Sequence, residues 1–67
     1  MNPQPPVDRP PRLLPAKRAA EFLGLPYTSL RDAAFRGEVP VVKVASRWYF
    51  DTRDLEDFIR SHKERMQ

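Results

Sequence analysis

Apolar residues recur at helical spacing over residues 16–23 and again over residues 27–36, which predicts two short amphipathic helices. The residues that share the two apolar faces are Ala19, Ala20, Leu23, Leu30, Ala33 and Ala34. Gly24 follows the first helix and Gly37 caps the second, at positions where glycine commonly ends a helix. Because only a short turn separates them, the two helices are expected to form a helix-turn-helix.

The pattern changes to that of strands in the middle of the chain. Residues 39–44 are rich in valine and residues 47–50 are mostly aromatic, which predicts a β-hairpin. The connecting Ala45-Ser46 lacks the glycine that a tight hairpin turn prefers, so we expect a loop a residue or two wider. Trp48 shares a strand face with Phe50 and is therefore expected in the core rather than on a binding surface.

A third amphipathic helix is predicted to open at Asp51 and to continue to about residue 61. Asp51 and Asp54 are spaced as in a capping box, in which the first residue accepts from an amide of the opening turn. The expected buried stripe consists of Leu55, Phe58 and Ile59. Leu13 and Leu14, ahead of Pro15, are expected to form an extended segment that packs on the core.

The 67 residues are enough for one small domain, which we place at residues 13–61. Residues 1–12 hold five of the eight prolines and are expected to form a disordered or extended arm, and residues 62–67 a frayed basic tail. With no cysteine and the single histidine His62, the chain is expected to hold no disulfide, metal or cofactor. No apolar run could span a bilayer or serve as a secretory signal, which predicts a cytoplasmic protein without a membrane partner.

Basic and acidic residues are unevenly distributed, although the net charge is only +3. Bases predominate up to residue 48, and the start of the third helix is acidic. The acidic residues there are Asp51, Asp54, Glu56 and Asp57. This layout suits a DNA-binding face backed by a face that avoids DNA. Lys17 and Arg18 occupy the first turn of the first helix, where a nearby phosphate would offset their repulsion by the helix dipole; two solvated charges are the alternative.

Nothing in the sequence favours catalysis. The chain contains no glycine-rich phosphate loop, no pairing of a nucleophile with a histidine and no HExxH motif. Helix capping explains the carboxylates at residues 51–57. We therefore expect a binding protein and not an enzyme.

Helix-turn-helix, hairpin and helix, in this order, resemble the excisionase-like, MerR-like winged-helix family of small DNA-binding proteins. The matching stretches are AAEFLGL at residues 19–25, TSLR at 28–31, RGEVP at 36–40, VKV at 42–44, RWYF at 47–50 and DLEDFI at 54–59. The resemblance implies a mainly α fold with one β-hairpin, a winged helix-turn-helix. The chain departs from the family pattern where Pro15 and Pro26 replace helix-capping residues, where Ala45-Ser46 replaces a glycine pair, and where Lys17 and Arg18 replace acidic residues.

By this resemblance the second helix is the recognition helix, lying in the major groove with Thr28 and Ser29 close to phosphates or bases. Arg31 matches the arginine with which similar proteins contact DNA; the alternative is a solvated charge on the helix. Arg36 is expected to contact a phosphate. Asp32 has three open roles, namely accepting from cytosine N4, orienting Arg31 or Arg36, and repelling wrong sequences.

The hairpin is the wing of the resemblance. Arg47 at its tip is expected to enter or line a minor groove, helped by Ser46 and Lys43, with a solubilising charge as the alternative. Tyr49 faces away from Trp48 and is expected to pack against the third helix or to contact a partner. The predicted DNA-binding residues are Lys17, Arg18, Tyr27, Thr28, Ser29, Arg31, Asp32, Arg36, Lys43, Ser46 and Arg47.

The resemblance implies an excisionase, a recombination directionality factor that binds and bends double-stranded attachment-site DNA cooperatively and helps an integrase to excise a prophage. A tyrosine or serine recombinase and further copies of the chain are thus the expected partners. A coiled coil and an effector domain are not seen in the sequence, so small-molecule sensing is not expected. The alternatives are a small transcription regulator of phage genes and a protein-interaction adaptor that never contacts DNA.

Overall fold

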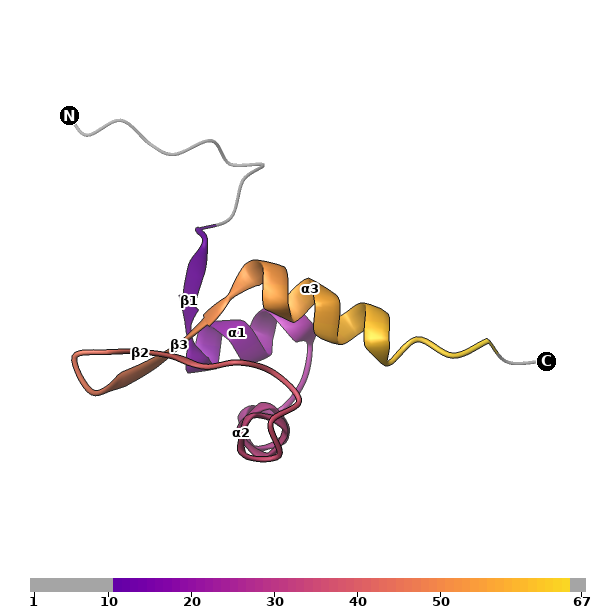
Figure 1. Cartoon of the computed structure of the whole chain (residues 1–67), viewed down its shortest axis with the longest axis horizontal. Helices are drawn as coiled ribbons and strands as arrows, with labels where there is room; N and C mark the ends of the chain where they lie inside the picture. Colours follow the sequence, from indigo (N-terminus) through magenta and orange to yellow (C-terminus); the bar gives the residue numbers. More distant parts are fainter. Residues whose placement is uncertain (1–10, 66–67) are drawn as a thin grey trace.

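The structure is a computed structural model that describes residues 11–65. Its elements are β1 (Leu13–Pro15), α1 (Ala16–Leu23), α2 (Tyr27–Phe35), β2 (Val42–Val44), β3 (Arg47–Asp51) and α3 (Thr52–Ser61) (Figure 1). The predicted winged helix-turn-helix is confirmed, with β1 added to the hairpin as a third strand. The arm expected over residues 1–12 falls almost entirely outside the described residues, as does the end of the expected tail, so both stay predictions.

Both helices of the helix-turn-helix start after a proline and finish at a left-handed glycine. Pro15 and Pro26 precede the helices with φ of −59° and −61°, and neither provides a side-chain cap. Gly24 and Gly37 adopt φ of +71° and +77°, a conformation that other residues rarely take. The amides of each glycine and of the next residue return to carbonyls of the last helical turn, which is a Schellman motif. Helix α2 ends at Phe35, slightly earlier than expected.

The turn of the hairpin contains only Ala45 and Ser46, and the expectation of a wider loop was wrong. Val44 pairs directly with Arg47, which leaves two residues to reverse the chain. Both have positive φ, 52° and 64°, as a type I′ turn requires. The right-handed twist of the flanking strands favours this turn strongly enough to hold non-glycine residues in it.

The sheet has the order β1-β3-β2, with both neighbouring pairs antiparallel. Leu14 lies opposite Phe50, and Lys43 lies opposite Trp48, so these four residues share one face. Arg47 is on the other face because successive side chains of a strand alternate. The wing therefore presents its two basic residues on opposite faces.

The core is small and centres on α1, which contacts α2, β1, β3 and α3. Its buried members are Ala19, Ala20, Leu30, Ala33, Val39, Phe50 and Leu55. Leu14 and Phe58 pack against these residues as expected. Leu13 and Ile59 were expected in the core but are 36% and 39% exposed. Leu13 lies on the outer face of the edge strand β1. Ile59 lies beside the inward-facing residues Leu55 and Phe58 of α3.

The start of α3 is tied to the residue before β1. Asp51 caps the helix by accepting from the Arg53 amide at 2.9 Å and from the Arg12 guanidinium at 3.0 Å. The Arg12 carbonyl in turn accepts from the Thr52 amide at 2.8 Å. The Arg53 amide, followed by the Arg12 guanidinium, holds the pKa of Asp51 below its ordinary value. The cap predicted at Asp51 is confirmed, while no bond from Asp54 back to Asp51 is present among residues 11–65.

The wing, which we define as residues 42–51, and α3 extend toward opposite ends of the molecule, with α1 between them (Figure 1). Helix α2 lies on the same side of α1 as the start of the wing's first strand, reached through residues 36–41. None of the helices described here is both long and apolar enough to cross a membrane.

Candidate nucleic-acid interface

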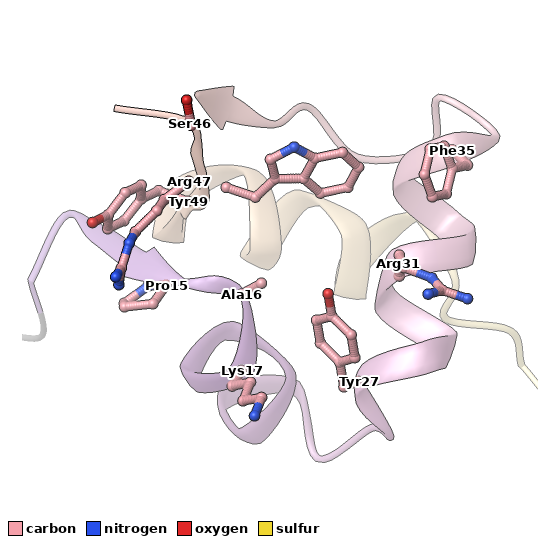
Figure 2. Close-up of a pocket in the computed structure, with 10 residues that line it drawn as sticks. Pro15, Ala16, Lys17, Tyr27, Arg31, Phe35, Ser46, Arg47 and Tyr49 are labelled. Carbon is pink, nitrogen blue, oxygen red and sulfur yellow. The ribbon is translucent and has the colours of Figure 1, made fainter. Parts of the chain in front are cut away.

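A cavity of about 600 Å³ lies between α2, the start of α1 and the wing (Figure 2). Its lining residues are Pro15, Ala16, Lys17, Tyr27, Arg31, Phe35, Ser46, Arg47, Trp48 and Tyr49. We call it the α2–wing cavity. Five of the predicted DNA-binding residues line it, and they come from three segments that are separated in the sequence. These five are Lys17, Tyr27, Arg31, Ser46 and Arg47.

The α2–wing cavity carries positive charge that no lining residue compensates. Lys17, Arg31 and Arg47 line it, and no carboxylate does. Within the described part of the chain, none of these three cations forms an ion pair. Uncompensated positive charge in a concave surface attracts anions and concentrates them there.

The N-terminal end of α1 opens into the cavity through Pro15, Ala16 and Lys17. The first turn has no side-chain cap and no acidic residue, so its amides keep their capacity to donate to an anion. This arrangement supports the predicted phosphate contact of Lys17. Arg18 is exposed and does not line the cavity, so the same prediction for Arg18 has no further support.

The outer face of α2 is set by its buried side. Leu30 and Ala33 are buried, Ala34 packs against them, and each residue of a helix is rotated by about 100° from the one before. Thr28, Asp32 and Phe35 therefore point most directly away from the core. Phe35 was not among the predicted contacts, which were limited to polar and charged residues and Tyr27. In the structure its side chain is 70% exposed.

The other candidates on α2 flank this outer face. Tyr27 and Arg31 lie on the side of the α2–wing cavity, and the Tyr27 ring projects between α1 and α2 (Figure 2). Ser29 and Arg36 lie on the opposite flank, by the same rotation of about 100° per residue. Asp32 forms no ion pair with Arg31 or Arg36 in the described residues, so nothing shows it orienting either arginine.

Arg36 is held by a carboxylate just beyond α2. Its Nε donates to Glu38 Oε2 at 2.7 Å, and this bond raises the pKa of Arg36 and lowers that of Glu38. The other Glu38 oxygen lies 3.6 Å from His62 Nε2. His62 also packs against Phe58 in a tilted arrangement, with ring centroids 4.2 Å apart. A phosphate contact by Arg36 would have to share this arginine with Glu38.

Aromatic rings form much of the wall between α2 and the wing. Phe35 and Trp48 meet edge to face, with centroids 5.3 Å apart and planes at 61°. Trp48 packs against the core, as expected, and also lines the α2–wing cavity. Tyr49 lies opposite Pro15 in the sheet and lines the cavity. Strand alternation had placed Tyr49 away from Phe50, but only the pairing of β1 with β3 shows what it faces.

Sequence comparison agrees with this architecture. The model of a helix-turn-helix domain family matches residues 13–63, from the first strand to just past α3. Neither the curated proteins nor the solved structures contain a match to the chain. Because the family model covers most of the chain, this protein belongs to the helix-turn-helix domain family, a DNA-binding family that includes excisionase-like proteins.

Proposed function

We propose that the chain binds specific sites on double-stranded DNA, with α2 in the major groove and the wing in the adjoining minor groove. The observation that carries this proposal is the α2–wing cavity, which Lys17, Arg31 and Arg47 line without a carboxylate. Between a major groove and the next minor groove runs one sugar-phosphate backbone. A protein that places a helix in one groove and a hairpin in the other must accommodate that backbone between them, and here the cavity occupies this position.

Residues on either side of the cavity then have distinct tasks. Thr28 and Asp32 face base edges in the major groove, where each base pair presents its own pattern of donors and acceptors. Arg31, between this face and the cavity, contacts guanine or a phosphate of the backbone. Ser46 and Arg47 face the minor groove at the tip of the wing. Tyr27 and Lys17 remain for the intervening backbone. The acidic residues of α3 lie outside the cavity, which keeps repulsive charge away from the phosphates.

We propose further that DNA binding serves excision, as in the excisionase-like members of the family. A single small module buries only about 600–1,000 Å² of protein surface on DNA and binds one site weakly. Copies bound side by side on repeated sites would supply the missing affinity and bend the DNA. The exposed Glu56 of α3 and the exposed basic residues Lys63 and Arg65 are available for contacts with a neighbouring copy or an integrase. In this role the chain binds and positions DNA and performs no catalysis.

The docking model is tested by Arg31→Ala and Arg47→Ala in gel shifts with attachment-site DNA. Each substitution should weaken binding by about fivefold or more, since good contacts of arginine with DNA contribute about 1–3 kcal/mol. Arg53→Ala is the matched control, because Arg53 is an exposed arginine on α3 outside the cavity. Wild-type affinity of both test variants, with their folding intact, would overturn the docking model.

The transcription-regulator alternative uses the same interface and differs in what the binding does. Several adjacent sites, bent DNA and stimulation of excision by an integrase would support the excisionase. A single operator without an effect on recombination would support the regulator. An adaptor that never contacts DNA would show no binding even to nonspecific DNA at low salt, where phosphate contacts are strongest.

A further inference from the structure

We infer that Phe35 reads the C5-methyl group of a thymine in the major groove, and this inference rests on the proposed docking of α2. Phe35 is 70% exposed, the most exposed of the large apolar side chains in the described chain. It lies on the outer face of α2 together with Thr28 and Asp32. It belongs neither to the buried core nor to the partly buried residues packed against it, so burial on folding does not account for it.

Trp48 holds the Phe35 ring in place. The two rings meet edge to face at 5.3 Å, and Trp48 itself packs against the core. Such an aromatic contact restricts the rotation of Phe35 before any partner arrives. The contact favours one orientation of the exposed ring, which reduces the conformational entropy lost when the ring is ordered on binding.

Thymine is the base whose edge matches a phenyl ring. In the major groove it alone among the four bases presents a methyl group, and phenylalanine is one of the side chains that contact it. Asp32 precedes Phe35 by three residues, so the two lie about one helical turn apart on the same outer face of α2. Asp32 and Phe35 would thus face the same or neighbouring base pairs, with a carboxylate for cytosine N4 and a phenyl ring for a methyl group.

The surroundings of Phe35 favour DNA over a protein partner. Arg31 lies one turn before it and lines the same cavity, and Arg36 follows it directly. The other aromatic rings of the cavity are those of Tyr27, Trp48 and Tyr49, and each of these carries a hydrogen-bond donor that suits a polar partner. A phenyl ring beside two arginines on the outer face of a recognition helix suits the methyl group of a base in a groove bordered by phosphates.

The experiment uses the whole chain and single-site DNA obtained by selection from a random pool. Each thymine of the selected site is replaced in turn by deoxyuridine, which removes only the methyl group, and binding is measured for wild type and Phe35→Ala. One replacement should weaken wild-type binding by about fourfold, the value of one buried methyl group, and should leave Phe35→Ala unaffected. Phe22→Ala, which alters a partly exposed phenylalanine of α1, should keep the wild-type response.

A second set of DNAs separates the methyl group from the rest of thymine. At the responsive position, cytosine should bind more weakly than 5-methylcytosine in wild type, and the two should bind equally in Phe35→Ala. Thermal unfolding followed by circular dichroism verifies that each variant is folded. If no deoxyuridine position distinguishes wild type from Phe35→Ala, the inference is wrong while DNA binding stands. If Phe35→Ala changes only self-association, Phe35 contacts protein and the inference is again wrong. Absence of any site in the selection would instead refute the proposed function.

Discussion

The wing turn contains two non-glycine residues in the left-handed region, and Ala45→Gly should therefore stabilise the protein. Ala45 and Ser46 have φ of 52° and 64°. Ala45 does not line the α2–wing cavity, so the substitution leaves the predicted DNA-binding residues unchanged. The variant isolates the backbone conformation of the turn from the function of the wing.

The size of the effect follows from two opposing contributions. An L-residue in the left-handed region costs about 1–2 kcal/mol relative to the right-handed one, and glycine removes this cost. Glycine also gives the unfolded chain more freedom, which opposes folding by about 0.4–1 kcal/mol. The net gain in the free energy of unfolding is about 0.5–1 kcal/mol. For a domain of this length it raises Tm by about 2–8 °C.

Differential scanning calorimetry of the whole chain measures this shift, and Gly37→Ala provides the reverse case. Gly37 has φ of +77°, and a Cβ added there would meet nothing within 4 Å, so only the backbone conformation opposes alanine. Gly37→Ala should lower Tm by a similar amount. A lower Tm for Ala45→Gly, or an unchanged Tm for Gly37→Ala, would show that left-handed backbone strain does not govern these turns.

Three further substitutions test the core, the cap of α3 and the start of α1. Leu55→Ala removes a fully buried side chain and should cost about 2–5 kcal/mol, enough to unfold much of a domain this small, as circular dichroism would show. The pKa of Asp51 is lowered in the folded protein, so its carboxylate stabilises the fold fully above the pKa of an unfolded aspartate, and this stabilisation is lost as the pH falls through the folded pKa. Asp51→Asn should therefore lower the urea midpoint more at neutral pH than in acid. Equal decreases at the two pH values would contradict this. Lys17→Ala with Arg18→Ala should flatten the dependence of log K on log salt by about 0.9 for each phosphate that is no longer neutralised, and an unchanged slope would remove α1 from the interface.

The helices were predictable because local chemistry determines where they begin and end. Prolines at positions 15 and 26 and glycines at positions 24 and 37 act within a few residues of the chain, and the structure follows them closely. The wing turn was mispredicted because its conformation is imposed by strand twist and not by its own two residues. Strand β1 was expected only as an extended segment, since its partner β3 begins more than thirty residues later.

The candidate site was predicted residue by residue but not as a cavity. Charge and resemblance pointed to Lys17, Arg31 and Arg47, and the packing of the elements places all three around one hollow. Phe35 was not predicted as a contact, although the spacing of Leu30, Ala33 and Ala34 already places it on the opposite side of the helix. The sequence could not show its contact with Trp48, which comes from another element.

The central position of β3 between β1 and β2 has a consequence for how the chain folds. Arg12 and Asp51 are 39 positions apart, so the sheet that supports α1 closes a loop spanning most of the chain. The entropy of closing this loop is lost before the contacts between its ends are formed, which favours folding in one cooperative step. Until Asp51 has emerged from the ribosome, the nascent chain cannot complete β3. The helix-turn-helix therefore emerges before β3, the strand that α1 packs on. DNA binding would then begin only after β3 has left the ribosome, with the wing and the recognition helix becoming competent together.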